Sequence, residues 1–558
     1  MPDTWKAISE RKKAEQASRI PKEWRIDPAH LPKNNTKNVI DVPRQCGLLS
    51  REELHVTEDY DATELLEKLR TGGLKSFDVT KAFCKRAAIA HQVTNCLTEI
   101  FFDVALDRAK YLDNYFSEHG KPFGPLHGLP ISLKDSFKIK GQDASIGFAA
   151  FAFKPSTTNA PLVDLLLDAG AVLYCKTNIP QSLMQLDSHN NVFGRVLNPL
   201  NLKVTAGGST GGEGALIAMR GSVLGVGTDI GGSIRVPAMC NGLYGVKPSW
   251  QRVPYSGQQA AGLDGVSYLS VHASAGPIAT SMRDCEMFLK TVAAGQPWKL
   301  DADVAYGLWE EQGPIKTKKD LVVGIVRRDG LIDPLPPINN VVSETADMLR
   351  AQGIQTVELD ISHLFKQCQS LANVLFSIDG NNYVFDVLEQ MGEPLSPWLS
   401  TRLKRKSPIT LDKLREAHVK RAQLREKFLK IWQDPSTGRE IDAIICPVAP
   451  HPVPPIDRWN GVSYTSSFVL LDYPAGTIPV RPLVSSDLRA NVPSIPPLGP
   501  WDKVNRELWT KVDKEEYLGT PLCVQVVAPT LQERRLVSAM QIIDEALKAQ
   551  MTLERSKL

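Results

Sequence analysis

The feature that most constrains this chain is a concentration of glycine between residues 207 and 245. One cluster reads GGSTGGEG at residues 207–214, and a second reads GVGTDIGGSIR at residues 225–235. Because glycine has no Cβ, such backbone can turn sharply and approach other groups closely, as catalytic and anion-binding loops require. We therefore weigh three kinds of site: a phosphate-binding loop, a nucleophile elbow, and a site built on two serines.

A phosphate-binding loop is disfavoured because its charged partners are missing. A Walker loop needs a lysine that reaches the phosphates, and no lysine directly follows either cluster. A dinucleotide fingerprint needs spaced glycines and an acidic residue about 20 residues further on, which paired glycines around serines do not match. The cysteines and histidines show no zinc spacing either. We expect an enzyme without nucleotide, cofactor or metal.

A nucleophile elbow is the second kind of site. Residues 207–211 match the G-x-S-x-G pattern, which would make Ser209 the nucleophile of an α/β-hydrolase esterase. Such a triad also needs an acid and a later histidine. Three histidines follow at suitable distance, but none stands in a recognisable motif: His363, His418 and His451. The esterase stays open as an alternative.

Two long motifs resemble the amidase signature family. GPLHGLPISLKD at residues 124–135 is similar to the lysine motif of that family, and residues 207–235 are similar to its serine signature. The resemblance implies a catalytic triad of Lys134, Ser209 and Ser233. The spacings of 75 and then 24 residues agree with the family pattern. The sequence of residues 184–250 is most similar to the fungal acetamidase and general amidase branch, to which fatty acid amide hydrolases are related.

The resemblance also implies a role for each group. Ser233 attacks the amide carbonyl, Ser209 relays the proton, and Lys134 is the base. The base must be a neutral amine, so its pKa has to fall well below the usual value of about 10.4. The family holds the relay serine behind a cis peptide bond, here Gly208–Ser209. An oxyanion hole is implied at four consecutive backbone amides, those of Ile230, Gly231, Gly232 and Ser233.

Several nearby residues have two interpretations. Asp229 and Arg235 flank the nucleophile and are either supports of its loop or an ordinary ion pair. His127 is interpreted as structural, because this triad needs no histidine. Cys523 stands where the family resemblance leads us to expect glycine, which indicates tighter packing in the closing strand.

The hydrophobic pattern predicts an α/β fold, because short apolar runs alternate with helical stretches. Strands are expected at 131–133, 171–175, 321–326 and 443–446, and helices at 4–19, 79–90, 162–169, 341–352 and 411–432. We expect a single large domain over residues 61–558, with a central mixed β-sheet flanked by helices as in the amidase signature fold. Residues 1–60 are expected to form an N-terminal helical arm.

Composition and charge limit the kinds of binding partner that the sequence predicts. Lys+Arg 65 against Asp+Glu 62 gives a formal net charge of +3, which calls for neither nucleic acid nor an anionic membrane. No uncharged apolar run approaches the ~18 residues of a transmembrane segment. The nine cysteines are scattered and are expected to stay reduced. These observations predict a soluble intracellular protein.

The last three residues predict a compartment. Ser556, Lys557 and Leu558 form the tripeptide that the peroxisomal import receptor reads at a free carboxyl end. We expect a peroxisomal protein, and a cytoplasmic one otherwise.

Together these features predict hydrolysis of a linear carboxylic amide to an acid and ammonia or an amine. The peroxisomal ending favours N-acyl or fatty amides, whose acids could enter β-oxidation. Besides the esterase, an amidase-fold subunit or scaffold that depends on a partner stays open. The sequence is also compatible with a homodimer.

Overall fold

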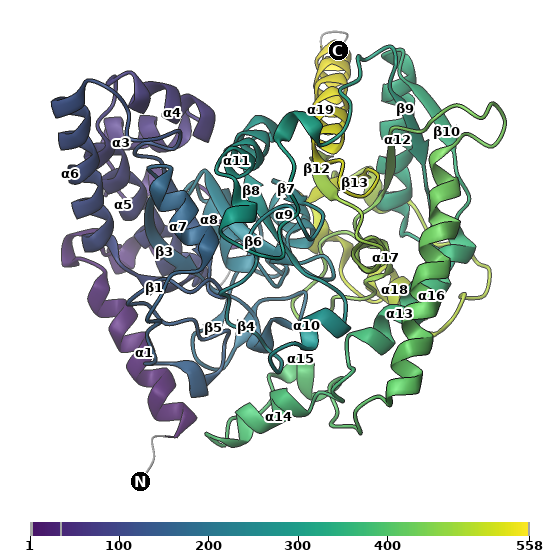
Figure 1. Cartoon of the computed structure of the whole chain (residues 1–558), viewed down its shortest axis with the longest axis horizontal. Helices are drawn as coiled ribbons and strands as arrows, with labels where there is room; N and C mark the ends of the chain where they lie inside the picture. The colour runs from purple at the N-terminus through teal and green to yellow at the C-terminus, as the bar shows by residue number, and fades with distance from the viewer. Residues whose placement is uncertain (1–3, 34–35, 556–558) are drawn as a thin grey trace.

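The computed structural model describes residues 4–33 and 36–555, which are built around one twisted mixed β-sheet (Figure 1). Within this range the sheet has 11 strands in the order β1-β3-β2-β6-β8-β7-β12-β13-β11-β9-β10. Their bounds, in that order, are Leu97–Ile100, Val172–Thr177, Pro130–Lys134, Leu224–Asp229, Ser274–Ala279, Tyr244–Lys247, Ala475–Pro482, Pro521–Val527, Ala443–Pro447, Val322–Ile325 and Gln355–Glu358. A separate ribbon pairs β4 (His189–Asn190) with β5 (Gly194–Arg195).

Strand direction changes along the sheet. β3, β2 and β6 run parallel to one another, and so do β11, β9 and β10. Antiparallel strands join these two parallel parts and also add β1 at the edge. The expected class, a single large α/β domain with a mixed central sheet between helices, is confirmed.

The helices cover both faces of the sheet. Their bounds are α1 Trp5–Arg19, α2 Val42–Gln45, α3 Arg51–Glu58, α4 Ala62–Arg70, α5 Ser76–Thr94, α6 Phe102–His119, α7 Pro161–Asp168, α8 Gly211–Ala218, α9 Arg235–Asn241, α10 Val266–Leu269, α11 Met282–Ala294, α12 Pro336–Ala351, α13 Ser362–Leu375, α14 Asn382–Glu389, α15 Pro397–Ser400, α16 Leu411–Leu429, α17 Ser463–Leu470, α18 Pro500–Thr510 and α19 Glu533–Arg555. Short 3-10 turns complete the connections.

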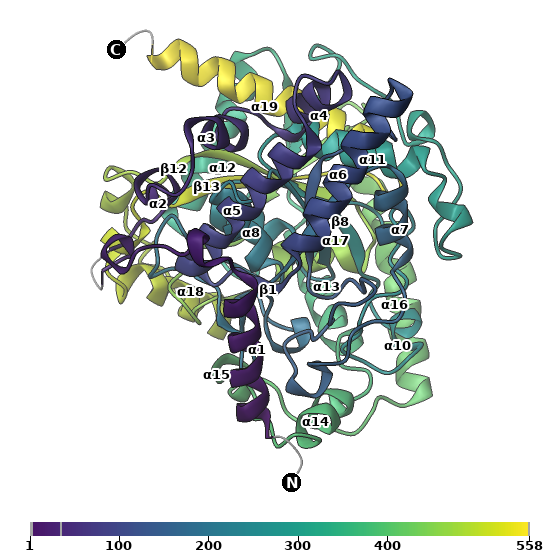
Figure 2. The ribbon, with the colours of Figure 1, turned by 90° about the vertical axis from the view of Figure 1, so that its left-hand side faces the viewer.

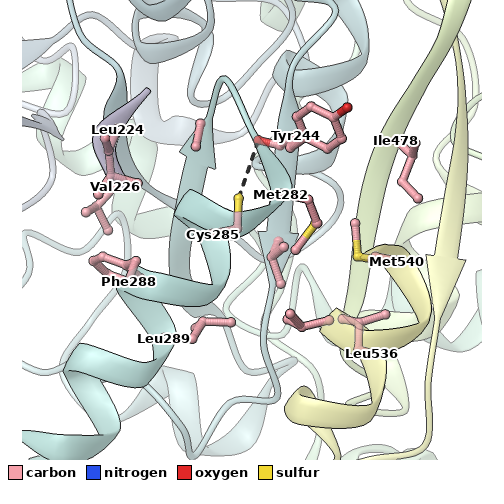
Figure 3. Packing of buried hydrophobic residues seen from close by; sticks show 14 of the residues in the cluster. Leu224, Val226, Tyr244, Met282, Cys285, Phe288, Leu289, Ile478, Leu536 and Met540 are labelled. Atoms are coloured by element: carbon pink, nitrogen blue, oxygen red, sulfur yellow. Dashed lines mark hydrogen bonds between the residues drawn. The ribbon is translucent and has the colours of Figure 1, made fainter. Parts of the chain in front are cut away.

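The largest hydrophobic cluster lies where α11 and α19 pack on the sheet. Phe288 of α11 lies beside Val226, the thiol of Cys285 points to the carbonyl of Tyr244, and Met540 of α19 lies near Ile478 of β12 (Figure 3). Strand β2 contributes Ile131 and Leu133 to the same cluster. Because successive side chains of a strand point to opposite faces, Ser132 and Lys134 are directed to the other face. The apolar layer thus fixes which way the predicted catalytic lysine points.

The predicted strands and helices are confirmed, and two helices begin earlier than the pattern indicates. α5 begins at Ser76 because the carboxylate of Asp113 accepts hydrogen bonds from the amides of Ser76 and Phe77. This cap comes from α6, so the local sequence cannot reveal it. α12 begins with Pro336 and Pro337. Proline suits the first helical turn, because a backbone N–H at that position would have no acceptor within the helix and proline has none.

The amino-terminal helix α1 lies along the edge strand β1 (Figure 2). Gln16 donates from its amide nitrogen to the carbonyl of Leu97 at 2.8 Å. The ammonium of Lys12 is buried and lies 2.9 Å from Glu99 and 2.7 Å from Asp143. α1 therefore packs on the domain itself. The division into an arm, 1–60, and a domain, 61–558, stays a prediction.

Two predictions concern targeting and membranes. The tripeptide 556–558 lies outside the described residues, so a peroxisomal location stays a prediction. Between residues 4 and 555, apart from 34 and 35, no helix combines the length and the apolar character that crossing a bilayer requires.

Candidate active site

The residues of the predicted triad come from strand β2, the residues that precede helix α8, and the loop after strand β6. Lys134 is the last residue of β2, and Asp229 is the last residue of the neighbouring parallel strand β6. The carboxyl ends of parallel neighbours lie at the same edge, where α/β proteins commonly bind ligands. Ser209 precedes α8, which packs against both strands, and Ser233 lies in the loop after β6.

The amine of Lys134 is the centre of this arrangement. Its Nζ lies 2.7 Å from Ser209 Oγ and 2.8 Å from Thr228 Oγ1, and the side chain is fully buried. Burial lowers the pKa of Lys134 to about 7, although the charges of Asp229, Asp135 and Glu213 oppose this shift. Desolvation disfavours the ammonium form, so a large share of the amine is neutral near neutral pH.

Ser209 stands in a tightly enclosed turn. The Gly208–Ser209 peptide bond is cis, as the family resemblance implies. Gly207 has a φ of +79°, which favours glycine. A Cβ at position 208 would lie 2.6 Å from the carbonyl oxygen of Gln185, so no larger residue fits there. The glycines of the first cluster thus place the Ser209 hydroxyl against Lys134.

The loop that carries Ser233 is held by Asp229. The Asp229 carboxylate accepts hydrogen bonds from the amides of Gly232 at 2.7 Å and Ile234 at 3.1 Å. These two residues flank Ser233, so its backbone is fixed from both sides. Burial raises the pKa of Asp229, but the charge and hydrogen bonds of Arg235 outweigh it and lower the pKa below its usual value. Asp229 therefore acts on the loop as a carboxylate.

Arg235 ties this loop to the second half of the sheet. It is fully buried and contacts both oxygens of Asp229, at 2.9 and 3.0 Å. Its Nη1 donates to the side-chain oxygen of Gln525 in β13, and its Nη2, which also contacts Asp229, donates to the carbonyl oxygen of Thr465 in α17. Of the two interpretations of this pair, the support of the loop fits the geometry.

The four amides of the predicted oxyanion hole differ in whether they have an acceptor within the chain. The amide of Gly232 donates to Asp229 at 2.7 Å, so it helps to hold the loop. The amides of Ile230, Gly231 and Ser233 donate to no acceptor in the part of the chain that the structure describes. The carbonyl of Gly231 accepts the hydroxyl of Thr465 at 2.5 Å, which orients that peptide. Three of the four predicted donors are free.

Two of the three histidines of the esterase alternative have backbone partners elsewhere, and the third, His363, is exposed on α13. His451 is buried with both ring nitrogens near the backbone of Pro452 and Asn460, and His418 contacts the carbonyl of Leu269. Among the described residues, the side-chain oxygen of Ser209 is hydrogen-bonded to Lys134 and not to a histidine. His127 accepts a hydrogen bond from the amide of Phe123, which agrees with a structural role.

Two residues near the triad had no role in the sequence interpretation. Thr228 lies inside the second glycine cluster, and only the structure shows its hydroxyl beside the Lys134 amine. Thr465 comes from α17, 234 positions away from Gly231. No motif marks it, so the sequence offered no signal for that contact.

Comparison with known proteins places the chain in a family. The sequence model of the Amidase family matches residues 78–537. The chain belongs to the amidase family. Its amidase relatives include the acetamidases of Aspergillus oryzae and Emericella nidulans, each 37% identical over 98% of this chain and 99% of the relative. A solved fatty acid amide hydrolase is 32% identical, with a TM-score of 0.87 over 97% of this chain and 94% of that one.

These similarities confirm the expected family, fold and enzyme class. The amidase domain is continuous through the whole sheet, and the chain is an amide hydrolase by family. The identity extends over nearly the full length of the acetamidases, so the amino-terminal region belongs to the shared architecture.

Proposed function

We propose that this amidase hydrolyses a linear carboxylic amide through an acyl-enzyme on Ser233, with Ser209 and Lys134 as the proton relay. The observation that carries the proposal is the 2.7 Å contact between the fully buried Lys134 amine and the Ser209 hydroxyl. A lysine whose pKa lies near neutrality can take a proton, as an ordinary exposed lysine cannot.

Acylation begins when the Ser233 oxygen attacks the carbonyl carbon. Ser233 passes its proton to Ser209 while Ser209 passes its own to the neutral amine of Lys134. The carbonyl π electrons move to oxygen, and the amides of Ile230, Gly231 and Ser233 donate to that oxyanion. Each such donor stabilises the transition state by about 3 kcal/mol.

Collapse of the tetrahedral intermediate breaks the C–N bond. The Lys134 ammonium returns its proton through Ser209 to the departing nitrogen, which leaves as ammonia or an amine. Water then attacks the ester carbonyl and passes a proton through Ser209 to Lys134. Lys134 returns a proton through Ser209 to the Ser233 oxygen as the C–O bond breaks, and the acid is released. The enzyme ends with a neutral amine and a free hydroxyl, as it began.

For the substrate, we propose N-acyl or fatty amides, because a solved fatty acid amide hydrolase is 32% identical and covers 97% of this chain. The relatives carry names of both kinds, acetamidase and fatty acid amide hydrolase. The test is a panel of primary amides from acetamide to long-chain amides, assayed with the purified full chain. Turnover of the long-chain members supports the proposal, and turnover of acetamide alone contradicts the fatty-amide part.

The same assay decides the non-enzymatic alternative. A scaffold or partner-dependent subunit would release no ammonia from any amide when the chain is alone. The homodimer and the peroxisomal import receptor stay predictions about partners.

We expect the rate to depend on pH through Lys134. The base is the unprotonated amine, and its pKa is lowered to about 7 by burial. kcat/KM should therefore fall as the pH drops below about 7 and level off above that value. Initial rates of ammonia release across this range measure it. An acid limb near the usual lysine pKa of about 10.4 would contradict the role of Lys134 as base.

A further inference from the structure

Glu213 is a buried carboxyl that the proposed reaction does not use. It lies in the first turn of α8, close behind Ser209, and is fully buried. Its Oε2 accepts a hydrogen bond from the Ser132 hydroxyl at 2.6 Å, and its Oε1 accepts one from the Thr177 hydroxyl at 3.1 Å. No ion pair to Glu213 is present among residues 4–33 and 36–555. Burying such a group with neutral donors alone is costly, so its position calls for a reason.

The two hydroxyls belong to residues that adjoin Lys134 in the sheet. Ser132 is two positions before Lys134 on β2, so the two side chains share one face of the strand. Thr177 is the register partner of Lys134 on the adjacent strand β3. Glu213 thus contacts two residues that adjoin the catalytic lysine in the sheet, on the face that α8 covers.

A third strand leaves room for the carboxyl. Gly225 of β6 is the register partner of Ser132. A Cβ at Gly225 would lie 2.0 Å from Glu213 Oε2, so only glycine admits the side chain. The Ser132 oxygen also lies 3.0 Å from the hydroxyl of Ser222, which donates to the carbonyl of Leu224. Three adjacent strands, β3, β2 and β6, therefore form the binding site of the Glu213 carboxyl.

We propose that Glu213 is a positioning residue for the Ser209–Lys134 pair. Its carboxyl fixes the start of α8, and with it Ser209, on the strands that carry Lys134 and Thr177. The inference rests on the proposed function, because it concerns the same proton relay. The reaction rate is sensitive to the placement of the reacting groups, since a shift of about 1 Å can lower it by about 100-fold.

The charge state of Glu213 supports this role. Burial raises its pKa to about 8, although the hydroxyls of Ser132 and Thr177 and the charge of Lys134 oppose the shift. The titratable groups that interact with it from the surrounding elements are Lys134 of β2, Tyr174 and Cys175 of β3, and Cys96 after α5. The protonated carboxyl adds no negative charge beside Lys134, whereas the carboxylate favours the ammonium form.

The test compares Glu213→Ala with Glu213→Gln in the full chain, with rates given per folded enzyme. Glu213→Ala should lower kcat by about 100-fold while KM stays near the wild-type value. Glu213→Gln keeps an acceptor oxygen and the size of the side chain, so it should restore most of the rate. Because the Glu213 carboxyl is protonated in the pH range where Lys134 titrates, the glutamine variant should keep the acid limb of kcat/KM near pH 7.

Glu393→Gln is the matched control. Glu393 is also a buried carboxyl with neutral donors, the amide of Ala149 at 2.8 Å and the side chain of Gln181 at 2.6 Å, and its pKa is likewise raised by burial. It does not contact the triad, so its variant should keep the wild-type kcat and acid limb.

A folded Glu213→Ala enzyme with wild-type kcat and acid limb would overturn the inference. If that variant does not fold, Ser132→Ala and Thr177→Val each remove one donor, and wild-type kinetics in both would overturn it equally. The proposed function is tested separately by the triad. Inactive Ser233→Ala with unaffected Glu213 variants contradicts only the positioning role, whereas an active Ser233→Ala contradicts the mechanism itself.

Discussion

Replacing Ser233 with alanine is expected to abolish amide hydrolysis, with kcat lower by on the order of 10⁵-fold. The variant lacks the oxygen that forms the acyl-enzyme. The loop should keep its shape, because Asp229 binds the amides of Gly232 and Ile234 and not the Ser233 hydroxyl. Ammonia release per folded enzyme measures the effect.

Ser538→Ala provides the control for that experiment. Ser538 is a buried serine of α19, on the side of the sheet that carries the α11 cluster. Its loss should leave turnover unchanged. Wild-type turnover by a folded Ser233→Ala enzyme would show that another group is the nucleophile.

Replacing Lys134 with methionine is expected to lower kcat/KM by about 10³- to 10⁴-fold. Methionine fills similar space in the buried site but offers no lone pair to take the proton of Ser209. The residual rate should also lose the acid limb near pH 7, because the group that titrates there is gone. The measurement is the pH profile of kcat/KM for both enzymes.

Lys247→Met separates loss of the base from loss of any buried lysine. Lys247 is also fully buried, burial lowers its pKa, and its amine donates to the carbonyl of Tyr473 at 2.9 Å. This variant is expected to be less stable, yet its folded fraction should keep the acid limb. An acid limb that survives in Lys134→Met and disappears in Lys247→Met would reassign the base.

The sequence predicts the site where chemistry depends on residues close to one another in a motif. The glycine clusters and the lysine motif indicated Lys134, Ser209 and Ser233, and the structure brings the first two to 2.7 Å. The same motifs did not show that the amide of Gly232 is used by Asp229. Every residue except proline has the same backbone amide, so the sequence does not show which acceptor it binds; that depends on how the loop folds.

Contacts made across the fold could not be predicted in this way. Thr465, Gln525 and Asp113 reach their partners from distant elements, and their local sequence is ordinary. The fold class was accessible because buried strands and amphipathic helices have different periodicities. The order of the strands could not be predicted, since the hydrophobic pattern of a strand does not show which strand pairs with it.

The most direct measurement is the site of covalent labelling by a fluorophosphonate, which reacts with activated serine nucleophiles. The labelled protein is digested, and the modified peptide is located by mass spectrometry, with Lys134→Met as a control that should label far more slowly. The proposed mechanism predicts an adduct on Ser233 in the peptide that follows β6. An adduct on Ser209, with Ser233 unmodified, would contradict it.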